Sequence, residues 1–198
     1  MDSARSSAQR SAASTKIVVA GGFGVGKTTL VGSVSEIMPL RTEALVTNES
    51  EGVDDLGSVP SKATTTVAMD FGRITLAEDL VLYLFGTPGQ RRFWFMWDDL
   101  CLGAIGAIVL VDTARLDEAF SPLDYFESKG LPFIVAVNQF EGSQRYPLAE
   151  VRAALAIPDH VPMIDIDARD RESSKQALIR ITEYALEQLT AQMAAPAY

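Results

Sequence analysis

A glycine-rich segment near the N-terminus has the residue types and the spacing of a phosphate-binding loop. GGFGVGKTT (21–29) fits the pattern G-x-x-x-x-G-K-[ST], follows the apolar run IVVA (17–20) and opens a helix-like stretch. Glycines let the backbone curl until successive N–H groups converge on phosphate oxygens, helped by the N-terminus of the following helix. In such a loop the lysine bridges the outer phosphates and the threonine hydroxyl binds magnesium. We therefore predict nucleotide-phosphate contacts from Phe23, Gly24, Val25, Gly26, Lys27, Thr28 and Thr29.

The composition is that of a single globular domain. The chain has 198 residues, of which 47% are hydrophobic and 22% charged, enough for one buried core. A net charge of −9 argues against a nucleic-acid binder, whose footprint is a basic patch. The longest apolar run, CLGAIGAIVLV (101–111), is too short to span a bilayer. Because Cys101 is the only cysteine, we expect a reducing, cytoplasmic location. We expect residues 1–14 to form a flexible arm and residues 15–198 to form one domain.

Strand-like and helix-like segments alternate along the rest of the chain. Apolar runs predict strands at 17–20, 66–76, 80–86, 104–112, 132–138 and 161–167, the second and third of which form a hairpin. Amphipathic stretches predict helices at 27–35, 116–130 and 147–157, and a last helix that opens at Ser173 with Gln176 at capping-box spacing. Pro122 predicts a helix that restarts or kinks, and the stretch from the first helix to Thr66 is typical of a long polar loop. This order predicts an α/β domain with a mainly parallel sheet and a ligand at the carboxyl ends of its strands.

From residue 16 to residue 190 the order of motifs resembles the Ras-like small GTPases. KATTTVAMDFG (62–72) resembles their first switch, FGTPGQRRF (85–93) the second, and VAVNQFEG (135–142) the strand end that reads the base. The phrases FGTPGQ, FWFMWDDL and DARDRES are most similar to the bacterial Rab-like, MglA-like branch, and within it to the CvnD-type GTPases of actinomycete conservons. The resemblance implies a P-loop NTPase with a Ras-like G domain, three α/β/α layers, a mainly parallel sheet and one antiparallel hairpin strand. It also implies GTP or GDP and Mg²⁺ as ligands.

The resemblance implies a first-switch threonine that contacts both magnesium and the γ-phosphate. Its hydroxyl would ligate the metal and its N–H would meet the phosphate, so that the loop is ordered only with a triphosphate. Thr64, Thr65 and Thr66 all compete for this role. The spacing T-x-x-x-D-F from Thr66 to Phe71 matches the family's step into the next strand, which favours Thr66. Thr64 and Thr65 could be no more than an extension of that strand.

The second switch lacks the acid that usually holds the metal through a water molecule. The family carries an aspartate three residues before the motif's glycine, Gly89, and here that position is Gly86. Octahedral magnesium can fill its remaining positions with water, so this loss weakens the site without abolishing it. MglA-like proteins share the loss and have an aspartate in the place of Asp70. The resemblance thus implies Thr28, Thr66 and Asp70 at the metal, with the alternative that Asp70 only faces solvent or caps a strand pair.

The resemblance also assigns a role in hydrolysis. Gln90 stands in the place of the glutamine that orients the attacking water, Gly89 retains the N–H that meets the γ-phosphate, and Lys27 and Thr66 complete the catalytic set. Phe23 replaces a usual glycine, and its ring either crowds the γ-phosphate or turns away and packs on a switch segment. The first switch offers no internal arginine. We expect hydrolysis no faster than roughly 10⁻⁴ to 10⁻³ per second.

Base recognition departs from the family motif N-K-x-D. Asn138 is kept, Gln139 replaces the lysine that covers the base, and Glu141 replaces the aspartate that pairs with two guanine N–H groups. Glutamate has the same carboxylate and accepts the same bonds. Ala168 matches the alanine whose N–H meets guanine O6, and Arg169 stands where lysine is usual. These matches imply guanine over adenine.

The resemblance implies a GTP/GDP switch with slow hydrolysis that signals through a partner complex. Its expected partners are a Roadblock-type regulator and a sensor-kinase-like protein, with the membrane reached only through them. The aromatic run FWFMW (93–97) is too apolar for a free loop, so we place Phe93 in the core, while Trp94 and Trp97 are either buried or partner contacts. Two alternatives remain: a nucleotide-stabilised adaptor without turnover, and an ATP-using P-loop phosphotransferase. The second lacks an evident basic lid.

Overall fold

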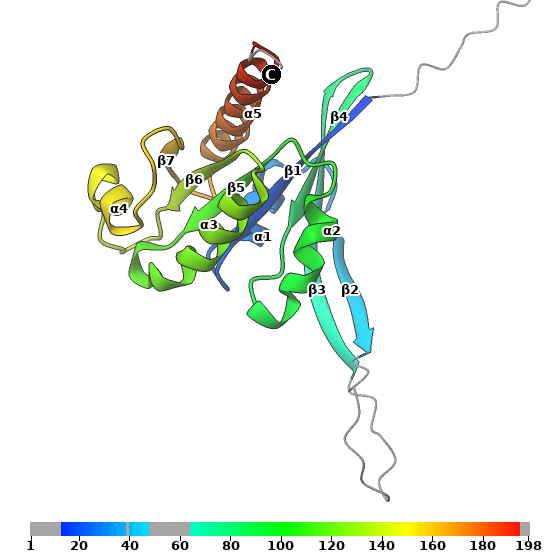
Figure 1. Ribbon diagram of the computed structural model, residues 1–198. Coiled ribbons are helices and arrows are strands. Elements are labelled where there is room, and N and C mark those ends of the chain that lie inside the picture. The colour runs from blue at the N-terminus through cyan, green and yellow to red at the C-terminus, as the bar shows by residue number, and fades with distance from the viewer. Residues whose placement is uncertain (1–12, 39, 48–63, 195–198) are drawn as a thin grey trace, which may run out of the picture.

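The computed structural model describes residues 13–38, 40–47 and 64–194, and within them one sheet carries helices on both faces (Figure 1). Seven strands form that sheet in the order β2-β3-β4-β1-β5-β6-β7. They are β1 (Ala13–Gly21), β2 (Leu40–Thr47), β3 (Thr64–Ala77), β4 (Leu80–Gly86), β5 (Gly106–Val111), β6 (Phe133–Asn138) and β7 (Met163–Ile166). The helices are α1 (Lys27–Val34), α2 (Trp97–Cys101), α3 (Asp117–Lys129), α4 (Leu148–Ala154) and α5 (Arg171–Ala194), with short 3₁₀ turns η1 (Arg91–Met96) and η2 (Thr113–Arg115).

The three layers follow from the alternation of side chains along the central strands. In β1, Ile17 and Val19 join a cluster with the apolar residues of α1 and α5. Val18 and Ala20 point to the other face and join a cluster with α2, α3 and α4. Successive strand residues point to opposite faces, so a continuous apolar run is buried on both sides. The α/β/α arrangement predicted for the chain is confirmed.

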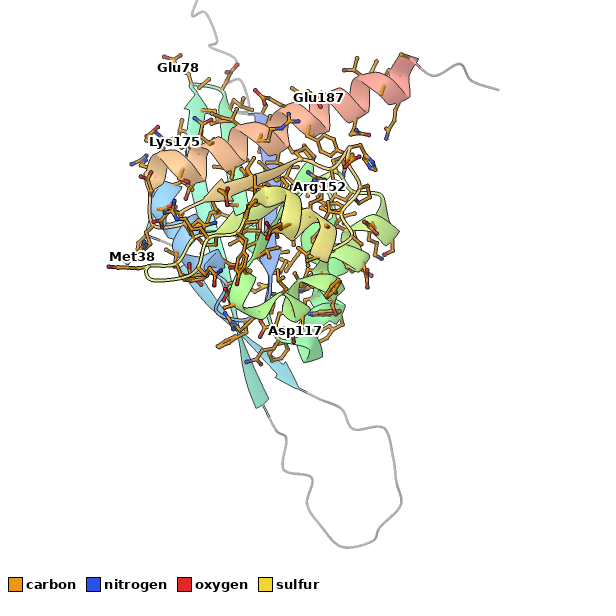
Figure 2. All side chains as sticks on the ribbon, turned by 90° about the vertical axis from the view of Figure 1, so that its left-hand side faces the viewer. Met38, Glu78, Asp117, Arg152, Lys175 and Glu187 are labelled. Carbon is orange, nitrogen blue, oxygen red and sulfur yellow. The ribbon has the colours of Figure 1, made fainter. Side chains whose placement is uncertain are left out.

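The sheet is mainly parallel, with one strand reversed. β1 lies parallel to β4 and β5, and β5, β6 and β7 continue in the same sense. β3 runs antiparallel to both β2 and β4, and its register places Asp70 opposite Gly86. Because β1 and β4 are parallel neighbours, the phosphate loop after β1 and the end of β4 lie together at the carboxyl ends of the strands. In Figure 2, Asp117 at the start of α3 lies toward this end and Glu78 in the β3–β4 turn lies at the opposite end.

The predicted polar loop before Thr66 is wrong in part, because it contains the strand β2. Leu40–Thr47 pairs with β3 along its whole length, from Leu40 opposite Phe71 to Thr47 opposite Thr64. β2 lies at the edge of the sheet, and its sequence, LRTEALVT, carries only a weak alternating pattern. Residues 48–63 lie outside the described residues. β1 begins at Ala13, and residues 1–12 of the predicted arm also lie outside them.

Two helix boundaries differ from the prediction. α5 begins at Arg171 and not at Ser173, because the carboxylate of Asp170 accepts the N–H of Ser173 at 2.9 Å and caps the helix there. α3 runs through Pro122 as one element, so the helix does not restart at that proline. Among the described residues, no helix is both long and apolar enough to cross a membrane.

The aromatic run after the second motif is anchored in the core. Trp97 is completely buried and its ring packs against Tyr125 and Phe126 of α3. Its indole Nε1 donates to the carbonyl oxygen of Pro88 at 3.2 Å. Phe93 is buried as predicted, whereas Phe95 is 62% exposed. The segment 88–97 is thus anchored to α3 through Trp97, and the ring of Phe95 within it is exposed.

Trp97→Ala should lower the free energy of unfolding by about 3–5 kcal/mol, because it leaves a cavity and an unpaired Pro88 carbonyl. Phe95→Ala, two residues away and exposed, should change it by less than about 0.5 kcal/mol. Urea titrations of both variants measure the difference. Equal losses in the two would contradict the anchoring role of Trp97.

Candidate functional site

A cavity of about 390 Å³ lies where the phosphate loop, the end of β4 and β3 meet. The loop occupies the turn from β1 into α1, at the carboxyl edge of the sheet, as expected for a ligand site in an α/β fold. The cavity lining joins residues from all three segments: Phe23, Gly24, Gly26, Lys27, Thr28, Thr29, Asp70, Thr87, Pro88 and Gly89. Most residues of the predicted phosphate contact are therefore brought together with Asp70 and Gly89.

The loop conformation depends on glycines. Gly24 and Gly26 have φ of 72° and 107°, in the left-handed region that other residues rarely adopt. A Cβ on Gly26 would lie 2.5 Å from the side-chain nitrogen of Asn138. Gly26 is also the residue at which α1 is capped at its N-terminus. The spacing of glycines seen in the sequence thus has a backbone reason at these two positions.

Lys27 is buried at the base of the loop. Its Nζ donates to the carbonyl oxygens of Gly21, at 2.9 Å, and Gly22, at 2.6 Å. Burial lowers the pKa of Lys27 from 10.5 to about 8, although the charges of Asp70 and Glu118 oppose the shift. An ammonium group held this way carries a positive charge that a phosphate would stabilise.

Gly89 lies directly over the loop. A Cβ at Gly89 would be 2.8 Å from Lys27 Nζ and 2.9 Å from the Cα of Phe23, so only glycine fits. Phe23 lines the cavity and is 64% exposed, with its ring at the rim and not in the core. Gln90 follows, exposed, and its carbonyl oxygen accepts the N–H of Phe93 at 3.0 Å. The backbone at Gly89, in the segment that resembles the second switch, therefore lies next to the position where Lys27 would bind a phosphate.

Asp70 occupies the space that a side chain at position 86 would need. The hydroxyl of Thr28 donates to Asp70 Oδ2 at 2.7 Å. A Cβ on Gly86 would lie 2.9 Å from both Cβ and Oδ2 of Asp70. Asp70 is buried, so the alternative in which it faces solvent is wrong. Asp70 of β3 therefore places a carboxylate beside Thr28, in the space that Gly86 of β4 leaves open.

The donor set fits a magnesium ion that keeps water and phosphate ligands. Among the described residues no group of three or more His, Cys, Asp or Glu side chains could hold a metal alone. Thr28 and Asp70 offer hard oxygen ligands, as magnesium prefers. The buried hydroxyl of Thr87 also lines this region and has no hydrogen-bond partner within the described part of the chain. Thr66 lies in β3 opposite Leu45, with Thr64 and Thr65 in the same strand.

The base end of the site is organised by Asn138. Its Nδ2 donates to the carbonyl oxygen of Val25 at 2.9 Å, and its Oδ1 accepts the N–H of Ala168 at 3.0 Å. The side chain thus joins the end of β6 to the phosphate loop and to the turn between β7 and α5. The Ala168 N–H, which the resemblance assigns to guanine O6, donates here to Asn138. Gln139 donates to Asp165 at 2.7 Å.

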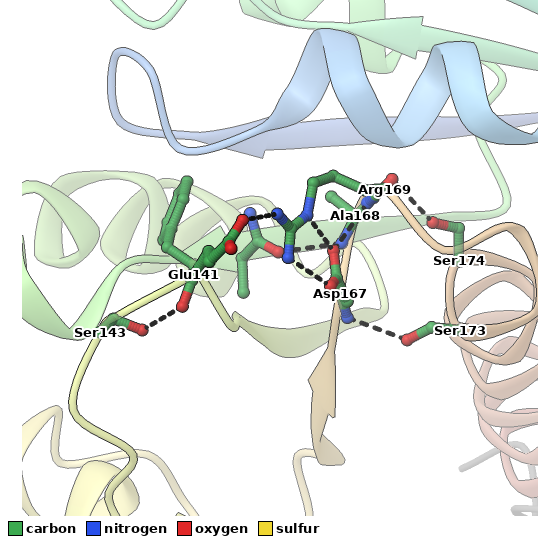
Figure 3. Close-up of polar contacts among 9 residues, drawn as sticks. Glu141, Ser143, Asp167, Ala168, Arg169, Ser173 and Ser174 are labelled. Carbon is green, nitrogen blue, oxygen red and sulfur yellow. Dashed lines mark hydrogen bonds and ion pairs between the residues drawn. The ribbon is translucent and has the colours of Figure 1, made fainter.

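Glu141, Arg169 and Asp167 form a charged chain at this end (Figure 3). Arg169 Nη1 contacts Glu141 Oε2 at 3.2 Å, and Arg169 Nη2 and Nε donate to the Asp167 carboxylate at 2.8 and 3.0 Å. Hydrogen bonds from Arg169 lower the pKa of Asp167 to about 2. Sequence reasoning missed Asp167, although it stands directly before Ala168 in the motif.

Sequence reasoning also missed two residues beside the phosphate loop. Arg115 Nη1, in η2, donates to the carbonyl oxygen of Phe23 at 2.8 Å. Glu118, the second residue of α3, lies so close that a Cβ on Gly22 would overlap it. Arg115 comes three residues after Asp112, just beyond the carboxyl end of β5, and β5 is the neighbour of β1 in the sheet. Its place after a strand was the signal in the sequence, because ligand sites of α/β folds lie at the carboxyl ends of strands.

Lys27 should make stability depend on pH. Its folded pKa of about 8 is below its unfolded value of 10.5, so the unfolded state holds the proton longer. The lowered pKa costs stability below about pH 8, and this cost is relieved as the pH rises from about 8 to 10.5. Over that range the free energy of unfolding of the wild type should rise relative to that of Lys27→Met, by roughly 3 kcal/mol at most. Urea titrations of both proteins at several pH values measure it. Parallel pH profiles would contradict a depressed pKa.

Comparison with known proteins places the chain in a family. A family model described as "Conserved hypothetical ATP binding protein" matches residues 19–188. The uncharacterized protein MJ1339 of Methanocaldococcus jannaschii is 32% identical over 126 residues, which are 63% of this chain and 69% of that protein.

Two solved structures share the fold. The FeoB G-domain of Methanococcus jannaschii aligns with a TM-score of 0.56 and 12% identity, over 87% of this chain and 98% of that domain. The cytosolic domain of the T. maritima FeoB iron transporter, in apo form, aligns with a TM-score of 0.60 and 17% identity, over 87% of this chain and 64% of that structure. The predicted P-loop G-domain fold is therefore confirmed, while the conservon and MglA-like assignment remains a prediction. Since the family model spans the chain from β1 into α5, the chain belongs to the family of conserved hypothetical ATP binding proteins.

Proposed function

We propose that the protein is a magnesium-dependent guanine-nucleotide switch that hydrolyses GTP slowly. The close approach of Gly89 to the loop carries the proposal, because a Cβ there would lie 2.8 Å from Lys27 Nζ and 2.9 Å from the Phe23 Cα. A terminal phosphate held by Lys27 would meet the Gly89 backbone at once, whereas a diphosphate would leave that contact unused. The bound nucleotide would thereby set the position of the segment that runs to Trp97.

Magnesium would be held by Thr28 and Asp70, with Thr66 as the proposed third protein ligand. When bound, the ion neutralises phosphate charge and leaves its other positions to water and phosphate oxygens. Lys27 orients the outer phosphates, and Gln90 is placed by sequence to orient the attacking water. Phe23 lines the cavity, and its ring is proposed to restrict access to the loop.

Guanine is favoured by the charges at the base end. A carboxylate accepts two adjacent N–H groups on the guanine edge, whereas adenine presents a ring nitrogen acceptor in the same place. Glu141 is the proposed acceptor, with Asp167 and Arg169 beside it, and Gln139 lies in the same turn. The description of the family names ATP, and so adenine is the base against which the proposal is tested.

Signalling through a partner complex is the proposed use of the switch. The partners proposed from the resemblance are a Roadblock-type regulator and a sensor-kinase-like protein, which would bring a cytoplasmic switch to the membrane. The exposed rings of Phe23 and Phe95 lie on the loop and on η1, where a partner would sense the nucleotide.

Competition binding tests the base. We expect GTP and GDP to bind at least about tenfold more tightly than ATP and ADP, because a paired acid leaves adenine unmatched. Glu141→Ala should weaken guanine nucleotides and leave adenine nucleotides unchanged, and Lys27→Ala should weaken both. Glu150→Ala, on α4, is a matched control. Equal competition by ATP together with an unaffected Glu141→Ala would assign the protein to adenine nucleotides.

A swap of the acid between strands tests the metal site. Asp70→Gly should raise the Mg²⁺ concentration needed to retain nucleotide by about tenfold or more. Gly86→Asp should also impair retention, because its Cβ would meet Asp70 at 2.9 Å and would add a second carboxylate. The double variant Asp70→Gly/Gly86→Asp should recover most of the wild-type Mg²⁺ dependence, since φ of Gly86 is not in the left-handed region.

The measurement is GDP dissociation at a series of Mg²⁺ concentrations, with Asp79→Gly in the β3–β4 turn as the control. A double variant that is weaker than both single variants would show that Asp70 has another role.

A further inference from the structure

Arg115 is fixed beside the phosphate loop by an acid that is only slightly exposed. Its Nε and Nη2 lie 3.1 and 3.0 Å from Asp112 Oδ2, and the Asp112 side chain is 11% exposed. The other oxygen of Asp112 accepts the N–H of Ala114 at 2.9 Å, which fixes the carboxylate in turn. The guanidinium can therefore direct Nη1 to the Phe23 carbonyl oxygen, at 2.8 Å, without free rotation. A planar fork with several donors suits this task, and a lysine would not.

Glu118 places a negative charge against the same loop. A Cβ on Gly22 would lie 2.8 Å from the Glu118 Cβ, so the acidic side chain packs on the loop backbone. Its Oε1 lies 3.4 Å from Arg115 Nη1. Both groups act on Lys27, whose pKa Glu118 raises and Arg115 lowers. The two charges are therefore within electrostatic reach of the place where phosphates would bind.

An unmasked carboxylate at this position would repel a nucleotide. Phosphate groups carry several negative charges, and repulsion at short range is only weakly screened in a partly buried site. Arg115 meets two carboxylates and one loop carbonyl with a single positive charge. Removal of Arg115 would free the Phe23–Gly24 segment and would leave Glu118 and Asp112 facing the loop.

We propose that Arg115 is a positioning residue of the nucleotide site, which holds the Phe23 carbonyl and masks Glu118 from the phosphates. The inference rests on the nucleotide binding proposed above. It concerns the loop and its neighbouring charges, and not the base or the metal. Arg115 acts through the loop backbone and through Glu118.

Affinities for fluorescent GDP and for a non-hydrolysable GTP analogue test the proposal. Arg115→Ala should weaken both by about tenfold or more, the effect expected for loss of a charged hydrogen bond. Glu118→Gln should bind as tightly as the wild type or more tightly. Arg115→Ala/Glu118→Gln should recover to within about threefold of the wild type, because the repelling charge is gone. Arg115→Lys, which keeps the charge and loses the fork, should lie between.

Arg180→Ala is the matched control, because Arg180 also bridges two carboxylates, Glu183 and Glu187, but on α5. It should leave both affinities unchanged, and thermal unfolding of every variant should confirm a folded protein. The weakening by Arg115→Ala should shrink as salt is raised. The inference on Arg115 is overturned if the wild type binds nucleotide and Arg115→Ala binds it equally well, or if the double variant is as weak as the single one. Either result leaves the proposed function standing. A wild type that binds neither guanine nor adenine nucleotides would overturn the proposed function with it.

Discussion

The side-chain amide of Asn138 holds together three segments that are far apart in the chain. Its two bonds reach the Val25 carbonyl in the phosphate loop and the Ala168 N–H before α5. Because the side chain is buried, an unmade bond here would cost the full desolvation of an amide group. Gly26 makes the approach possible, since a Cβ there would lie 2.5 Å from the amide nitrogen. The phosphate end and the base end of the site therefore cannot shift independently.

The placement of the acid in β3 follows from the antiparallel pair. Residues opposite each other in such a pair share one face of the sheet, so Asp70 and Gly86 project toward the same space. Only one of them can carry a side chain there. A slip of one residue in the register of β3 would turn Asp70 to the other face, away from Thr28. The proposed metal site thus depends on the β3–β4 register as much as on the identity of the residue.

The parts of the site that sequence could predict are those encoded within one short segment. The loop from Gly21 to Thr29 has its own pattern, and the strands β4, β5 and β6 are marked by continuous apolar runs. The parts that it could not predict depend on packing between segments. Glu118 lies in a helix-like stretch and Arg115 directly before it, both are ordinary surface residue types, and the order of β1 and β5 in the sheet brings them to the loop. The strand β2 was missed because its residues carry a weak pattern, and pairing with β3 decides its structure.

The helix α3 joins the two sides of the site mechanically. At its start, Glu118 packs on the loop and Arg115 precedes it. Near its end, Tyr125 and Phe126 pack on Trp97, whose indole holds Pro88, the residue before Gly89. Rotation of side chains in so closely packed a core is limited, so a displacement of Gly89 must bend the segment 89–96 or shift α3 itself. A shift of α3 would move Glu118 relative to the loop. The position of Gly89 over the loop and the packing of Glu118 against Gly22 are therefore linked through one helix.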